Sequence, residues 1–112
     1  MIERAVAFVN EKVKQAFEAL DNGAYEEKEL KKYLERAISD LKENPRCGVQ
    51  IKKKLIPKEY VQKYNVQNLW KYNLPNAWCL VYTISSEEEI AILSVLVEWF
   101  DHKNYEKRFK YK

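Results

Sequence analysis

Histidine, glycine and cysteine are all scarce in this chain of 112 residues, which has one histidine, two glycines and two cysteines. Cys47 and Cys79 lie far apart and form no CxxC pair, so we expect free thiols in a cytosolic protein. Two cysteines and one histidine make a structural zinc site improbable, and we expect no metal and no other cofactor. No glycine-rich phosphate-binding loop stands out either.

Long apolar runs are also missing. No stretch of 18 or more apolar residues exists, so we expect no transmembrane helix and no membrane partner. The N-terminal stretch MIERAVAFVNEKVK has too short an apolar segment, and the wrong flanks, for a signal peptide. We therefore expect a cytoplasmic protein. The length and the ordinary composition, 46% hydrophobic and 33% charged, fit one globular domain over residues 1–112.

The net charge is only +3, but it is distributed unevenly. Residues 1–45 carry a net −2 and residues 73–112 a net −1, whereas residues 46–72 carry a net +6. In that middle segment Glu59 alone opposes seven cations, which are Arg46, Lys52, Lys53, Lys54, Lys58, Lys63 and Lys71. Such a segment is a candidate phosphate-facing surface. A solvated face of a lysine-rich protein is the alternative interpretation.

Helical periodicity dominates the first part of the chain. Asn10 is a good N-cap, and apolar residues then recur at helical spacing as far as about Leu20. A second helix is predicted from about Tyr25 to Glu43, where Asn44-Pro45 ends it. The two form a helical hairpin. The preceding residues 2–9 could be a strand or the start of a helix, and periodicity leaves both open.

After Gly48 the periodicity becomes that of strands. Val49 and Ile51 alternate with Gln50, Lys52 and Lys54, which predicts a strand with one basic face. A short helix is predicted from Pro57 to about Asn65. Further strands are predicted over 69–74, 78–84 and 90–100, with turns at Pro75-Asn76 and Ser85–Glu88 and a short final helix or turn capped by Asp101.

These elements predict an α+β fold in which a helical hairpin packs on one face of a small antiparallel sheet. By strand parity, Trp70 and Tyr72 belong to the covered face, while Lys71 points to the other. We expect this second face to be open, with Cys79 facing it. Lys52, Lys54 and Lys71 could then gather there.

The stretch EWFDHKNYEKRF holds the one histidine, His102, followed by Tyr105 one helical turn later. Histidine suits proton transfer near neutral pH, and tyrosine can donate a hydrogen bond or stack on a base. Nearby lysines could neutralise the charge that develops when an RNA 2′-hydroxyl attacks its phosphodiester. The alternative is that His102 is only a surface ion-pair partner beside an acidic residue.

The order strand–helix–helix–strand–strand–strand resembles that of the RelE/ParE toxin superfamily. The stretches LWKYNLPNAWCLVYTI and ILSVLVEWFDHKNYEKRF are similar to its central hairpin and its last strand and tail, and look most like archaeal members. The RelE-like branch implies a toxin of a type II toxin–antitoxin system. It would be a metal-independent endoribonuclease that cleaves messenger RNA in the ribosomal A site and is neutralised by an antitoxin protein.

The resemblance also implies roles for individual residues. His102 matches the acid/base position of the tail, and Tyr105 matches the tail aromatic. Lys52 and Lys54 match basic residues on the strand after the helical hairpin, and Lys71 matches a commonly basic position on the next strand. Further candidates for contacts with RNA are Arg46, Lys53, Lys103 and Arg108.

Two arginines of the family pattern are replaced. Cys79 stands where a "YRL" arginine is typical, and Leu74 and Pro75 stand where another arginine ends the preceding strand. A charge-assisted arginine contact contributes roughly 1.5–3 kcal/mol, so each loss could cost about tenfold in rate. A non-nucleolytic ParE-like or degenerate member, acting by binding gyrase or an antitoxin, is therefore a second hypothesis, and enzymatic activity is an open question.

Overall fold

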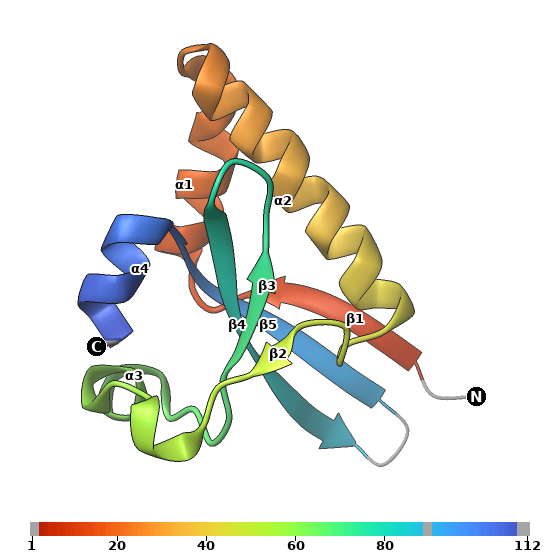
Figure 1. The fold of residues 1–112 in the computed structure, drawn as a ribbon. Helices are drawn as coiled ribbons and strands as arrows, with labels where there is room; N and C mark the ends of the chain where they lie inside the picture. Colours follow the sequence, from red (N-terminus) through yellow and green to blue (C-terminus); the bar gives the residue numbers. More distant parts are fainter. Residues whose placement is uncertain (1–2, 89–90, 110–112) are drawn as a thin grey trace.

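The computed structural model describes residues 3–88 and 91–109. In chain order the elements are β1 (Glu3–Phe8), α1 (Glu11–Ala19), the 3₁₀ turn η1 (Leu20–Asn22), α2 (Tyr25–Glu43), β2 (Val49–Gln50), the 3₁₀ turn η2 (Lys53–Leu55), α3 (Lys58–Tyr64), β3 (Trp70–Asn73), β4 (Trp78–Glu88), β5 (Ala91–Asp101) and α4 (His102–Phe109). The strands form one sheet in the order β1-β5-β4-β3-β2 (Figure 1). The α+β prediction is confirmed, and none of the described helices is long and apolar enough to cross a bilayer.

The N-terminal segment is a strand, which resolves the ambiguity of residues 2–9 in its described part. β1 pairs with β5 in parallel, while every other strand pair in the described sheet is antiparallel. A parallel pair needs a crossover connection, and the helical hairpin α1–α2 begins that connection. The sheet is therefore mixed, with its parallel pair at the β1 edge.

The helical hairpin forms where the sequence predicts it. The Asn10 side chain caps α1 by accepting a 2.9 Å hydrogen bond from the backbone N–H of Val13. α2 spans the predicted Tyr25–Glu43 and buries one apolar stripe, consisting of Leu30, Leu34, Ala37 and Leu41. This stripe packs on one sheet face, against Leu74, Leu80, Tyr82 and Leu96. The covered face of the prediction is thereby confirmed.

The second sheet face is also covered, so the prediction of an open face is wrong. α3 and α4 lie next to each other there and close a second apolar cluster (Figure 1). Tyr105 and Phe109 stand four residues apart on α4 and form an apolar stripe that has to be buried. The cluster also takes in Cys79, which has the predicted parity but lies in a core.

Two strand boundaries differ from the prediction. The strand after Gly48 ends at Gln50, and the chain then turns through η2, because the adjacent Leu55 and Ile56 both pack against the second cluster. In a regular strand, successive side chains point to opposite faces, so one of these two residues would have pointed away from the cluster. The turn predicted at Ser85–Glu88 is wrong as well, because β4 continues to Glu88, which pairs with Ala91 of β5 after a register irregularity that follows Ser85.

Candidate functional site

Four of the five predicted catalytic residues line one cavity of about 320 Å³. These four are Lys52, Lys54, Lys71 and Tyr105, which come from the segment after β2, from β3 and from α4. Its remaining lining residues are Val49, Gln50, Ile51 and Leu55. We call this cavity the lysine pocket. It lies at the β2 edge of the sheet, and all of its lining residues except Tyr105 belong to the segment with net charge +6.

Backbone hydrogen bonds place the first two lysines. The N–H of Ile51 donates to the carbonyl of Leu69 at 2.8 Å, which holds the chain against the sheet. The N–H of Leu55 then donates to the carbonyl of Lys52 at 2.8 Å and closes the turn. Lys52 and Lys54 therefore reach the same cavity from a turn, without the strand that the sequence predicts. Three lysines that line one cavity suit an anionic ligand such as phosphate.

Tyr105 is a wall of the pocket and a member of the core at once. Its side chain is only 3% exposed, and its ring stacks on Phe109 with centroids 4.5 Å apart. The ammonium of Lys71 lies 4.9 Å from the same ring centroid, in a cation–π contact. A nucleobase could stack on Tyr105 only by displacing one of these neighbours.

His102 does not line the lysine pocket with the other four candidates. It is the first residue of α4, directly after Asp101, which caps the helix by accepting a 2.8 Å hydrogen bond from the N–H of Asn104. The His102 side chain is 69% exposed, and its Nε2 lies 2.5 Å from an Oε1 of Glu106 one turn later. This is the surface ion-pair arrangement of the alternative interpretation.

The four further candidates for RNA contacts are dispersed. Arg46, Lys53 and Lys103 are exposed, on three different segments. Arg108 is half-buried and donates to Glu59 of α3 at 2.8 Å. Its guanidinium also lies 5.7 Å from the ring centroid of Phe100. Arg108 therefore has partners inside the fold that hold α4 in place.

Cys79 and Leu74, which replace the family arginines, are both buried. Cys79 is 5% exposed, and burial raises the pKa of its thiol to about 11. It packs in the same cluster as Tyr105 and Phe109, beneath α4. An arginine there would have to bring a charge into this apolar core, which is costly. The role of Cys79 is therefore to fill space in this core.

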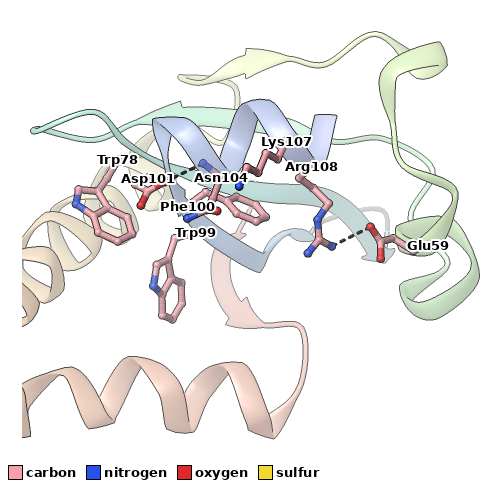
Figure 2. Close-up of a pocket in the computed structure, with 8 residues that line it drawn as sticks. All are labelled: Glu59, Trp78, Trp99, Phe100, Asp101, Asn104, Lys107 and Arg108. Atoms are coloured by element: carbon pink, nitrogen blue, oxygen red, sulfur yellow. Dashed lines mark hydrogen bonds and ion pairs between the residues drawn. The ribbon is translucent and has the colours of Figure 1, made fainter. Parts of the chain in front are cut away.

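A charged network that the sequence does not reveal joins α3, β5 and α4. The hydroxyl of Tyr60 donates to Glu98 at 2.6 Å, and Arg108 lies 4.0 Å from the same carboxylate. Burial and the neighbouring Glu98 both raise the pKa of Tyr60. A cavity of about 480 Å³ lies beside it, between Glu59, α4 and two tryptophans (Figure 2). The only sign of this network in the sequence is the position of a charged residue, Glu98, inside an otherwise apolar run.

The described residues contain no cluster of three or more His, Cys, Asp or Glu side chains that could hold a metal ion. The sequence matches no protein-family model and no curated protein, and the fold matches no solved structure. The resemblance to the RelE/ParE superfamily therefore rests on the order of the elements and on the two stretches quoted above.

Proposed function

We propose that this protein is a RelE-like toxin that binds the sugar-phosphate backbone of messenger RNA in the lysine pocket. The observation that carries the proposal is that Lys52, Lys54 and Lys71 converge on one cavity beside Tyr105. Lysine is a common phosphate ligand, and a cluster of cations is the usual electrostatic footprint of nucleic-acid binding. The net charge of +6 on residues 46–72 adds a positive electrostatic potential around the pocket, which attracts RNA.

In the proposed reaction the three lysines hold the scissile phosphate. They stabilise the charge that develops as the RNA 2′-oxygen bonds to phosphorus and the bond from phosphorus to the 5′-oxygen of the next nucleotide breaks, which is usually the largest single contribution to such a step. Water can take the proton of the 2′-hydroxyl and supply a proton to the leaving 5′-oxygen. The ribosomal A site as the place of cleavage and an antitoxin as the inhibitor follow from the resemblance. A proton-transfer role for His102 requires its side chain to leave Glu106 and to reach the pocket, which it does not line.

A second candidate is RNA or protein binding without cleavage. The outward position of His102 and the burial of Cys79 favour it, because the pocket then lacks a histidine and an arginine. Lysines alone can bind phosphate, but each acts as a point charge without the bidentate geometry of arginine.

The deciding experiment is translation of a defined messenger RNA by purified ribosomes, with cleavage detected by primer extension. We expect Lys52→Ala/Lys54→Ala to lower cleavage at least about 100-fold, since it removes two charge-assisted contacts of roughly 1.5–3 kcal/mol each. Lys14→Ala/Lys42→Ala removes the same charge from exposed positions on α1 and α2 and is the matched control. His102→Ala tests the proton-transfer role.

The outcomes separate the two candidates. Cleavage by the parent that is lost in the Lys52→Ala/Lys54→Ala variant supports the nuclease. An intact message, with binding of single-stranded RNA that needs the same lysines, supports binding without cleavage. If the parent neither cleaves nor binds, or if the control variant loses as much as the pocket variant, the proposal is wrong.

A further inference from the structure

The C-terminal half of β5 has an open backbone edge. β1 pairs with β5 only as far as Phe8 opposite Leu96, and the N–H of Val9 adds one last hydrogen bond to the carbonyl of Leu96 at 2.8 Å. β5 continues to Asp101, and its residues 98–101 pair with β4 on the other side, while Val97 is the extra residue at a register irregularity between the two strands. Figure 1 shows β5 running on past the end of β1 toward α4. Among the described residues, none pairs with the backbone of 97–101 on the β1 side.

Two cavities border this edge and share Trp99. One, of about 310 Å³, lies between α1 and α3 over Val97, Glu98 and Trp99. The other, of about 480 Å³, continues along Trp99 to Asp101 beneath α4 (Figure 2). We call them together the β5-edge groove. Five strand residues span about 17 Å, enough for a short extended segment.

We infer that the β5-edge groove binds an extended acidic peptide of a partner protein, which adds to the sheet as a strand beside residues 97–101. An edge strand turns every second N–H and C=O outward, so a peptide can satisfy them with main-chain hydrogen bonds. The half-buried rings of Trp78 and Trp99 offer apolar contacts to alternate side chains of such a peptide.

Charge decides the chemistry of the occupant. The lining of the groove carries four cations against three carboxylates, a net charge of +1. The carboxylates already have partners inside the fold: Glu59 pairs with Arg108, Glu98 accepts from Tyr60, and Asp101 accepts from the N–H of Asn104. The three lysines of the groove form no ion pair with a described residue, and they are Lys12 of α1, Lys63 of α3 and Lys107 of α4. The groove therefore presents unpaired cations, which an acidic peptide complements.

This surface is independent of the proposed function. The lysine pocket lies at the β2 edge of the sheet, and the β5-edge groove lies at the opposite edge. The two share no lining residue. Loss of one activity can therefore be measured without loss of the other.

The test uses a fluorescein-labelled eight-residue peptide of alternating valine and glutamate, with binding followed by anisotropy. We expect Lys12→Glu/Lys63→Glu/Lys107→Glu to weaken binding at least tenfold. The matched control Lys14→Glu/Lys28→Glu/Lys42→Glu changes the same charge at exposed positions elsewhere and should bind as the parent does, as should Lys52→Ala/Lys54→Ala. A peptide with every backbone amide N-methylated should not bind, because neither of its edges can then donate hydrogen bonds to the ladder.

Amide hydrogen exchange locates the added strand. We expect new protection within residues 97–101 on binding of the peptide. Equal binding of the N-methylated peptide would overturn the inference, because contact would then come from side-chain charge alone. New protection at Val49–Gln50 in place of 97–101 would overturn it too, since the peptide would be using the other edge.

Discussion

Tyr82 joins two distant segments through a single buried hydroxyl. The hydroxyl donates to the carbonyl of Pro45 at 2.7 Å and accepts from the N–H of Gly48 at 3.2 Å. Tyr82→Phe leaves both backbone groups without this partner, so we expect the free energy of unfolding to fall by about 1–3 kcal/mol. Urea denaturation measures it. Tyr25→Phe, at a 75% exposed ring, is the control and should change stability by less than about 0.5 kcal/mol.

Cys79 makes stability sensitive to alkaline pH. Burial raises its thiol pKa from 9.0 to about 11, so the folded state favours the protonated form. Its contribution is complete below pH 9 and is lost as the pH rises through about 11. We expect the free energy of unfolding to fall more steeply between pH 9 and 11 in the parent than in Cys79→Ala. Equal slopes in urea titrations of the two proteins would refute this.

At the scale of elements, α4 closes the second core and also forms a wall of the lysine pocket. Phe109 is its last described residue, and its ring lies 6.0 Å from Tyr60 and 6.3 Å from Phe100 between centroids. We expect Phe109→Ala to cost about 3–5 kcal/mol and to speed amide exchange throughout α4. Denaturation and hydrogen exchange check both. Lys103→Ala, on the exposed side of the same helix, should leave both unchanged.

Elements with local signals could be predicted from the sequence. The caps Asn10 and Asp101 and the apolar stripe of Tyr25–Glu43 are encoded within a few residues, and the structure has them as expected. The covering of the second face depended on contacts across the whole chain. Tyr105 is predicted from the sequence to have a chemical role, although its i, i+4 spacing to Phe109 already indicates a buried stripe.

In the candidate site, too, local features could be predicted from the sequence, and features that depend on distant contacts could not. Lysine alternation after Gly48 predicted that Lys52 and Lys54 share a face, and both do reach the lysine pocket. They reach it from a 3₁₀ turn, which depends on where Leu55 is buried and could not be read locally. His102 follows a strand directly, but its outward direction depends on how α4 docks, which the sequence did not indicate.

At the scale of the molecule, both sheet faces are covered, so the edges are left for recognition. The β2 edge carries the lysine pocket, and the far edge carries the groove beside residues 97–101. Edge strands commonly need protection from unwanted pairing. In this fold α1, α3 and α4 flank the β5 edge and line the β5-edge groove, so they restrict access to the exposed backbone of residues 97–101.

The net charge of +3 conceals a local +6, and binding of RNA should respond to the local value. Each neutralised phosphate of a single strand contributes about 0.7 to the slope of log affinity against log salt. We expect Lys52→Ala/Lys54→Ala to lower that slope by about 1.4, because it removes two phosphate contacts. Anisotropy with a single-stranded RNA over roughly 50–200 mM salt measures the slope.

Lys14→Ala/Lys42→Ala removes the same charge from the acidic segment 1–45 and should leave the slope unchanged. A matching decrease in this control would mean that the RNA responds to diffuse charge over the whole surface. The decrease confined to the pocket variant would instead mean that phosphates sit at Lys52 and Lys54, where the turn after β2 holds both lysines against the sheet edge.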